Sequence, residues 1–181
     1  EEISATIIQP TVDGMKAEGH PYVGILYCGL MMVDGAPYVI EYNVRMGDPE
    51  TQAVLPLLDH SLYDLMEQAL DGAVPIAYRV KEGAATCVVL ASEGYPGSYE
   101  KGRPISGLDS LDDDVIMFHA GTRIDERGRL LSDGGRVLSV VGLGADLELA
   151  GTKAYNGIAK INFPGSFYRK DIGENIGVPG E

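Results

Sequence analysis

The sequence predicts an α+β protein, in which helices and a strand pair precede a small domain of short strands with one covering helix. Three observations support this fold class. Apolar residues recur at helical spacing near both ends of the chain. Short runs rich in β-formers, separated by Gly, Pro, Asp and Ser, occupy most of the remainder. The stretch 73–83 is punctuated by glycine and proline, so we expect domains at 1–72 and 84–181 joined by a linker at 73–83.

Composition restricts the class of protein before any motif is considered. The 181 residues are 45% hydrophobic and 23% charged, which is typical of globular domains, and no run approaches the roughly 18 apolar residues of a membrane-spanning helix. The net charge of -13 argues against nucleic acid as a partner. The first residues lack a signal-peptide pattern, and Cys28 and Cys87 lack metal-ligand spacing. We therefore expect a cytoplasmic protein with reduced core cysteines and no membrane partner.

The elements of the first 45 residues are predicted from periodicity and turn signals. Apolar residues in 3–18 follow helical spacing, and Pro10 must either kink that helix or begin a second one. The run 22–33 is apolar on both faces, which predicts a strand covered on both sides. An Asp-Gly pair at 34–35 predicts a tight hairpin turn, after which 36–45 returns as the partner strand.

That return strand carries an unusual polar row. Glu41, Asn43 and Arg45 follow one another at period two, so they share one face of the predicted strand. A carboxylate and a carboxamide at this spacing offer the oxygen ligands that Mg²⁺ takes together with phosphate and water. A guanidinium at the next position pairs with phosphate or carboxylate. The alternative is an ordinary solvated sheet face.

The loop "MGDPETQ" continues the acidic theme after the strand. Asp48 and Glu50 are predicted to lie beside the metal face, although each is also a candidate surface acid or helix cap. Thr51 is a candidate cap for the helical pattern over 53–72, which Pro56 interrupts.

The second half of the chain changes to strand periodicity. Runs at 84–92, 114–121, 129–134 and 136–144 predict strands, and apolar spacing in 146–161 predicts a covering helix. We found no internal repeat or low-complexity segment.

Three places in this half are candidates for a functional role. His119, next to Gly121, is a candidate base or a structural hydrogen-bonding residue. The stretch "SDGGRV" predicts a tight hairpin whose amides and Arg136 hold a phosphate, or simply a turn. Arg169 and Lys170 favour solvated charges or an interdomain salt bridge.

Several of these motifs together resemble one family. "EYNVRMGDPETQ", preceded by "PTVDGMKAEGHPYVGILYCGLMM" and followed by "GYPGSYEKG", "FHAGT", "DGGRVLSVVGLG" and "FYRKDIG", is similar to the phosphoribosylamine–glycine ligases of the ATP-grasp superfamily. The resemblance covers nearly the whole chain in the family's order. Met46, where the family usually has Leu or Phe, is a small departure that preserves apolar volume.

The resemblance implies a step of purine synthesis, in which glycine, 5-phosphoribosylamine and ATP give glycinamide ribonucleotide, ADP and phosphate. It also implies the C-terminal half of an ATP-grasp domain before the small domain. Glu41 and Asn43 would hold Mg²⁺ or Mn²⁺, and Arg45 and Asp48 would act on the reacting groups. The substrate-binding residues that it implies are Gly47, Asp48, Pro49, Glu50, His119, Gly121, Thr122, Gly134, Gly135 and Arg136.

The family's N-terminal domain and the nucleotide-binding lid lie upstream of these motifs. We therefore expect a C-terminal portion that is inactive by itself. Two alternatives stay open: another ATP-grasp enzyme of purine or carboxylation chemistry, and a non-catalytic module that retains the fold.

Overall fold

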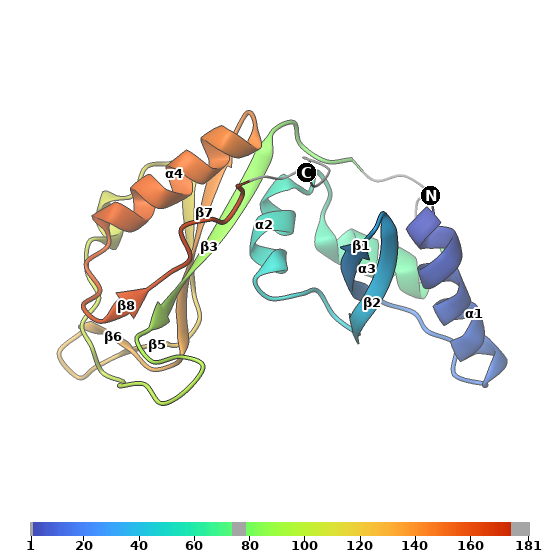
Figure 1. Ribbon diagram of the computed structural model, residues 1–181, viewed down its shortest axis with the longest axis horizontal. Coiled ribbons are helices and arrows are strands. Elements are labelled where there is room, and N and C mark those ends of the chain that lie inside the picture. The colour runs from blue at the N-terminus through green and yellow to red at the C-terminus, as the bar shows by residue number, and fades with distance from the viewer. Residues whose placement is uncertain (1, 74–78, 175–181) are drawn as a thin grey trace. The chain divides into compact units, whose positions relative to one another are not determined.

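The computed structural model describes residues 2–73 and 79–174, and these form two compact units. The first comprises Glu1–Asp48 and Asp59–Arg79, and the second comprises Pro49–Leu58 and Val80–Glu181. Each unit is described by itself (Figure 1).

The first unit begins with a helix in two parts. A π-helical turn, η1, spans Ser4–Ile8 and continues into α1, Gln9–Ala17. Pro10 lies in the first turn of α1, directly after the π-helical turn, and Ile8 before it is itself helical, so the backbone runs through the proline without a break. A second helical part thus begins next to Pro10, at Gln9, which is one of the two outcomes that the sequence predicted.

An antiparallel hairpin follows this helix. β1 (Tyr27–Val33) pairs with β2 (Ala36–Asn43) through the predicted Asp-Gly turn, whose residues have φ values of 50° and 80°. The ladder is interrupted between Gly29 and Leu30, because Glu41 faces Gly29 while Val39 faces Leu30. Ile40 is thus the extra residue of a β-bulge. The Thr11 and Tyr42 hydroxyls lie 2.9 Å apart and link α1 to this hairpin.

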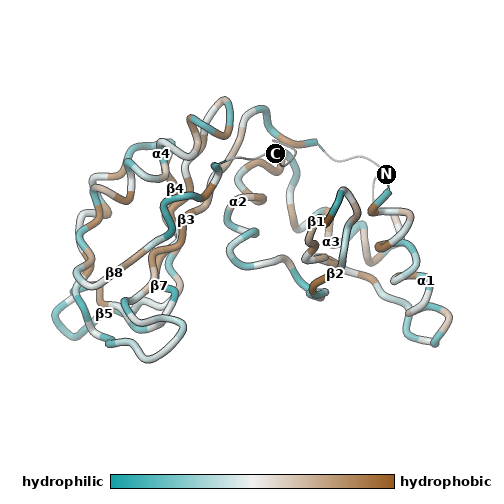
Figure 2. Tube along the Cα trace, in the orientation of Figure 1, coloured by the Kyte–Doolittle hydropathy of each residue, from teal (hydrophilic) through white to brown (hydrophobic). Residues whose placement is uncertain are grey.

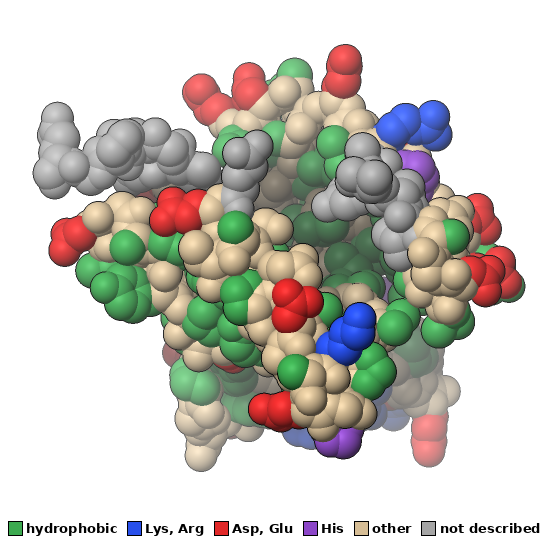
Figure 3. Space-filling view, turned by 90° about the vertical axis from the view of Figure 1, so that its right-hand side faces the viewer, with side chains coloured by type: hydrophobic (Ala, Val, Ile, Leu, Met, Phe, Trp, Pro, Cys, Tyr) green, Lys and Arg blue, Asp and Glu red, His purple; other side chains and the backbone are tan. Residues whose placement is uncertain are grey.

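The expectation of a strand covered on both sides is wrong for this hairpin. The strand begins at Tyr27 rather than at residue 22, and Met31 and Met32 are 54% and 56% exposed. Ile40 on the partner strand is 63% exposed. The physical reason is that, among the described residues, no helix or second sheet packs broadly on either face of this pair, so many of its apolar side chains stay exposed. Hydrophobic side chains accordingly appear on the surface in the space-filling view (Figure 3).

Two short helices replace the single interrupted pattern over 53–72. α2 spans Glu50–Leu57, with Pro49 at its N-cap and Pro56 in its last turn, and belongs to the second unit. Thr51 lies inside the first turn of α2, so the expectation that it caps the helix is wrong. α3 spans Leu62–Leu70 in the first unit, and its N-cap Ser61 accepts a hydrogen bond from the Asp64 amide.

The second unit is built on an antiparallel sheet with strand order β4-β7-β3-β8. Its strands are β3 (Ala84–Ser92), β4 (Val115–His119), β7 (Arg136–Gly144) and β8 (Ser166–Phe167). β3 and β7 have the predicted bounds, and β4 lies within the predicted run. These strands could be predicted because they carry continuous apolar stretches, as the hydropathy trace shows (Figure 2).

Helix α4, Leu147–Lys160, covers one face of this sheet, as predicted (Figure 1). Its N-cap Asp146 accepts a hydrogen bond from the Leu149 amide. The helix approaches β7 closely, and Gly144 allows this because it has no side chain. A Cβ at this position would lie 2.5 Å from the Ala150 nitrogen. The buried core beneath it is formed by Val88, Leu90, Ile105, Val115, Val137, Leu138, Val140, Ala154, Ile158 and Phe163.

A second, two-stranded sheet corrects the reading of "SDGGRV". β5 (Thr122–Ile124) pairs with β6 (Leu130–Ser132), whereas β7 pairs with β3 and β4. Residues 133–135 therefore connect two different sheets and do not form the predicted hairpin turn. A 3₁₀ turn, η2 (Leu108–Ser110), completes the elements.

The segment after β8 is fastened to α4 by one side chain. The Tyr155 hydroxyl donates a hydrogen bond to the Arg169 carbonyl and accepts one from the Ile172 amide, both at 3.0 Å. Arg169 forms an ion pair with Asp171, so this charge has a local partner, in line with the solvated reading of the sequence.

Among residues 2–73 and 79–174, no helix is long and apolar enough to cross a bilayer.

Candidate functional site

The first group of predicted residues lies at the end of β2. Asn43 Nδ2 donates a hydrogen bond to Glu41 Oε1 at 2.9 Å, so these two side chains lie side by side as the strand period predicted. Gly29 is the ladder partner of Glu41. A Cβ on Gly29 would lie 3.0 Å from Glu41 Cγ, so the glycine makes room for the carboxylate side chain across the strand pair. The sequence analysis missed this role of Gly29.

Arg45 does not continue the polar row in the way that the alternation predicted. β2 ends at Asn43, so Arg45 lies beyond the strand, and its Nη1 donates to the Met46 carbonyl at 2.9 Å. Gly47 is buried and Asp48 is exposed in the loop that follows. Arg45 therefore lies in the loop that follows the carboxylate and amide pair, two residues beyond the end of the strand.

The donor set at the end of β2 is small. The described residues contain no group of three or more His, Cys, Asp and Glu side chains that would hold a metal ion. Glu41 and Asn43 supply two oxygen-bearing groups, both accessible to solvent. This is the number of protein ligands that Mg²⁺ commonly accepts when substrate phosphates and water complete its shell.

The second group of predicted residues lies in two loops of the second unit. His119 Nδ1 and Thr122 Oγ1 are 3.0 Å apart, which fits the hydrogen-bonding reading of the histidine. The Gly121 amide donates to the Arg136 carbonyl at 3.0 Å. A Cβ on Gly121 would lie 2.5 Å from the Gly134 Cα, so the two loops touch through backbone alone.

Ser92 and Tyr95 hold the second of these loops in place. Ser92 donates from its amide to the Gly135 carbonyl and from its hydroxyl to the Gly134 carbonyl, both at 2.8 Å. The Tyr95 ring lies where a side chain on Gly135 would stand. The sequence analysis contains the motif around Tyr95 but predicts no role for this residue. Ser92 lies at the end of an apolar strand, and nothing in the sequence distinguishes it as functional.

The remaining predicted residues, Pro49 and Glu50, begin α2. They belong to the second unit, as do the loops around Gly121 and Gly134, whereas Glu41 and Asn43 belong to the first. The structure thus brings the predicted residues together in two groups.

Asp114 and Asp125, two of the second unit's acids whose pKa is lowered, lie outside these groups. A hydrogen bond from Lys153, 2.5 Å away, holds the pKa of Asp114 below its usual range. The Arg129 amide, which donates to the Asp125 carboxylate, lowers the pKa of Asp125 in the same way. Both acids fix structure, at the start of β4 and in the β5–β6 turn, and neither is placed for catalysis.

Comparison with family models gives two matches, in chain order. Residues 1–51 match the model described as "Phosphoribosylglycinamide synthetase, ATP-grasp (A) domain", and residues 85–175 match "Phosphoribosylglycinamide synthetase, C domain".

Curated relatives agree with these matches. The chain is 50% identical over 170 residues to the phosphoribosylamine–glycine ligase of Neisseria meningitidis, which covers 93% of this chain and 40% of that protein. It is 48% identical over 177 residues to the chicken trifunctional purine biosynthetic protein adenosine-3, covering 95% of this chain and 17% of that protein. The chain thus spans about 40% of the length of the phosphoribosylamine–glycine ligases from Neisseria meningitidis that it matches.

Solved structures extend the comparison to the fold. Phosphoribosylamine–glycine ligase from Thermotoga maritima superposes with a TM-score of 0.73 at 41% identity, covering 87% of this chain and 39% of that one. N5-carboxyaminoimidazole ribonucleotide synthetase from the same organism gives a TM-score of 0.58 at 16% identity, covering 90% of this chain and 42% of that one, which shows a shared fold alone.

Proposed function

Because the chain belongs to the phosphoribosylglycinamide synthetase family, we propose that it is the C-terminal portion of an ATP-dependent ligase that joins glycine to 5-phosphoribosylamine. The observation that carries this proposal is the Glu41–Asn43 pair, held at hydrogen-bond distance within a segment that matches the family's ATP-grasp model. ATP, glycine and 5-phosphoribosylamine are the proposed substrates, and a cytoplasmic location stays a prediction.

The proposed reaction has two steps. An oxygen of the glycine carboxylate attacks the γ-phosphorus of ATP, the bond to the β-phosphate oxygen breaks, and ADP leaves. The amine of phosphoribosylamine then attacks the acyl carbon, loses a proton, and inorganic phosphate departs. Both steps depend on positioning and charge neutralisation more than on a side-chain nucleophile.

Mg²⁺ or Mn²⁺ fits the residues at the end of β2. Glu41 and Asn43 would hold the ion, since a carboxylate and a carboxamide are hard oxygen donors and their side chains are already in contact. When bound, the ion would neutralise charge on the phosphates of ATP.

We assign the chain's own groups to complementary tasks. Arg45, a fixed cation in the loop after β2, neutralises charge on the transferring phosphoryl group. Asp48 is exposed in the same loop and faces the amino or ribose groups of the substrate. In the second unit, Gly121 and Gly134 let the two loops touch through backbone, which brings the segments that carry His119 and Arg136 together. His119, Thr122, Gly135 and Arg136 complete that proposed substrate surface. The other proposed substrate-binding residues are Gly47 in the first unit and Pro49 and Glu50 in the second.

Domain limits of 1–72 and 84–181, with a linker at 73–83, are also proposed. The ranges of the two family matches, 1–51 and 85–175, support them.

A paramagnetic titration of this chain tests the metal assignment without requiring turnover. Mn²⁺ should broaden backbone amide signals of residues 41–48 first, and Glu41→Gln should raise the concentration needed. Glu126→Gln, which removes an exposed acid from the second unit, is the matched control and should leave the titration unchanged. Broadening that starts elsewhere, or that ignores Glu41→Gln, contradicts the assignment.

The ligase itself is tested on the natural protein at the full length of its relatives. ADP release should require both glycine and phosphoribosylamine. A full-length protein that releases ADP with bicarbonate but not with glycine would instead support the carboxylation alternative.

A further inference from the structure

The connection between β6 and β7, residues 133–135, is fastened on both sides by one other segment of the second unit. On one side, Ser92 donates hydrogen bonds to two carbonyls of this connection, as described above. On the other side, the Gly102 amide donates to the Ser132 carbonyl at 2.7 Å. Residues 92–102 therefore form a loop that holds the connection from both ends, and we call it the 92–102 loop.

Tyr95, within the 92–102 loop, lies directly against the connection. A Cβ on Gly135 would lie 2.7 Å from Tyr95 Cε2 and still closer to Cδ2, so the ring occupies the place where a side chain would stand. Gly135 is buried, whereas Tyr95 is 36% exposed. The ring therefore covers the glycine with one part of its surface and keeps another part in solvent.

A tight turn and a second ring hold Tyr95 in this position. The Tyr95 amide donates to the Ser92 carbonyl at 3.1 Å. Gly94 has a φ of 96°, which residues with a side chain rarely adopt, and a Cβ there would overlap the Ser98 carbonyl. The Tyr99 ring lies 6.3 Å from the Tyr95 ring at an interplanar angle of 59°, a favourable tilted arrangement. The placement of Tyr95 is thus fixed through both its backbone and its ring.

The connection in turn fixes the start of β7, where Arg136 lies. The Asp133 amide donates to the Gly121 carbonyl at 2.7 Å, and the Gly121 amide donates to the Arg136 carbonyl at 3.0 Å. A shift of the connection therefore also shifts the residues on both sides of it. The three atoms nearest to a Cβ on Gly135 all belong to Tyr95, so loss of the ring leaves this side of the connection without support.

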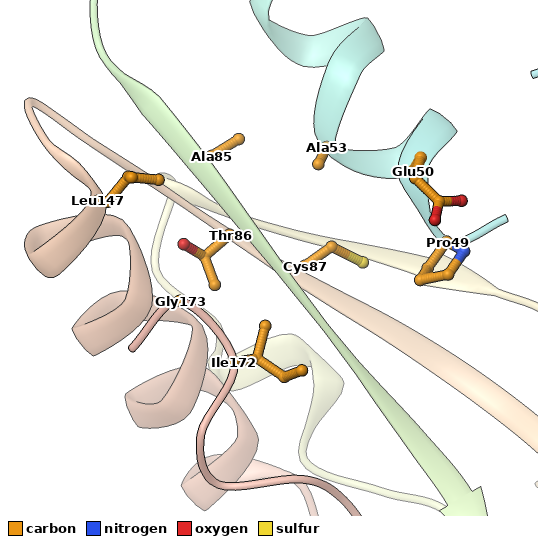
Figure 4. A pocket seen from close by; sticks show the side chains of 9 residues that line it. All are labelled: Pro49, Glu50, Ala53, Ala85, Thr86, Cys87, Leu147, Ile172 and Gly173. Carbon is orange, nitrogen blue, oxygen red and sulfur yellow. The ribbon is translucent and has the colours of Figure 1, made fainter. Parts of the chain in front are cut away.

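Of the three proposed substrates, 5-phosphoribosylamine is the one left to these loops. The proposed metal site places the ATP phosphates at the end of β2, and the glycine carboxylate must lie beside the γ-phosphate in order to attack it. Pro49 and Glu50 line a different hollow of the second unit, beside β3 (Figure 4). None of its nine lining residues is Lys, Arg or His, so a phosphate finds no counter-charge there. Arg136 brings to the loops a guanidinium, which suits phosphate recognition.

We propose that Tyr95 is a positioning residue for the binding of 5-phosphoribosylamine. Its ring holds the connection between β6 and β7 in the form that presents Arg136 to the phosphate of this substrate. The ring performs this task rather than the hydroxyl, because ring atoms are the ones that lie against Gly135. The inference rests on the proposed ligase function and assigns one of its substrates to the loops of the second unit.

Steady-state kinetics of the natural full-length protein tests the inference. Tyr95→Ala should raise the KM for 5-phosphoribosylamine about tenfold, while kcat and the KM for ATP stay within about twofold, because a less ordered loop weakens the binding of one substrate. Tyr95→Phe keeps the ring and should behave like the unaltered protein. Tyr63→Ala removes a tyrosine that is 67% exposed on α3 and is the matched control, which should leave all of these constants unchanged.

Gly135→Ala approaches the same contact from the other side. Alone, its methyl group would overlap the Tyr95 ring and should raise the same KM. Combined with Tyr95→Ala, the methyl group has the space that the ring occupied, so the double variant should bind 5-phosphoribosylamine at least as well as Tyr95→Ala alone. Additive losses would show that the two residues do not act through one contact.

The outcomes separate this inference from the ligase function. The inference is overturned, and the function stands, if Tyr95→Ala leaves the KM for 5-phosphoribosylamine unchanged, if it alters all constants alike, if Tyr95→Phe is equally impaired, or if the losses are additive. Should Tyr95→Ala not fold, Gly135→Ala decides alone, and an unchanged KM overturns the inference. An unaltered full-length protein that releases no ADP with glycine and 5-phosphoribosylamine overturns the proposed function itself.

Discussion

Replacing Glu41 by Gln tests the proposed metal ligand most directly. The change keeps the size of the side chain and its contact with Asn43, and it removes one negative charge. Glu41 is exposed, so a water-like dielectric is appropriate for estimating the effect. At a Mg²⁺–oxygen distance of about 2.1 Å, one charge on a divalent ion is then worth about 4 kcal/mol.

That energy corresponds to roughly three powers of ten in rate. The amide oxygen and an added water recover part of it, so we expect turnover to fall by at least about a hundredfold. The assay is the steady-state rate of the natural full-length protein against Mg²⁺ concentration, with Glu126→Gln as the control for charge. Normal turnover of Glu41→Gln at limiting Mg²⁺ would refute the reasoning and make this strand end an ordinary solvated surface.

Five further outcomes are expected. Gly29→Ala should weaken Mn²⁺ binding severalfold while preserving the fold, because its methyl group displaces the Glu41 side chain; unchanged affinity would show that the carboxylate adapts. Gly121→Ala should lower the free energy of unfolding by about 1–3 kcal/mol, because the added methyl group would overlap the backbone of the neighbouring loop. Gly151→Ala is the control and should not lower it, since a Cβ there meets nothing within 4 Å; urea unfolding of both variants measures the difference. The pKa of Asp114 is lowered beside Lys153, so the ionised carboxylate stabilises the fold above the usual carboxyl pKa of about 3.9. This stabilisation is lost as the pH falls through the lowered pKa. Asp114→Asn should therefore flatten the dependence of the urea midpoint on pH between neutral and strongly acidic solution. The chain alone should show no ADP release and should bind a hydrophobic dye through its exposed hairpin; turnover near full-length rates, or no dye fluorescence, would contradict these two expectations.

The second unit was predictable because its strands bury long apolar runs between polar turns. β3 and β7 have the predicted bounds, since nine residues of β-forming sequence flanked by glycine and acids leave little choice. β5 and β6 have three residues each, which is too short for a period to be recognised. The pairing of β6 with β5 rather than with β7 depends on contacts between distant loops, and "SDGGRV" taken alone carries no sign of them.

The first unit was less predictable because an apolar strand implies a neighbour without showing that one is present. The run ending in Met31 and Met32 has the composition of a buried strand, yet both side chains are exposed. Glu41 and Asn43 were predicted to lie together because side chains alternate up to the end of β2. Arg45 was predicted to continue the strand, but β2 ends two residues earlier, at Asn43.

The Tyr155 hydroxyl makes the Ile172 amide a natural probe of how α4 sits on the segment after β8. The Ile172 amide donates its hydrogen bond to the Tyr155 hydroxyl of α4. It therefore exchanges with deuterium only when this hydrogen bond breaks. Its protection factor should therefore follow the opening of this contact and drop sharply in Tyr155→Phe, while amides in the middle of α4 remain slow.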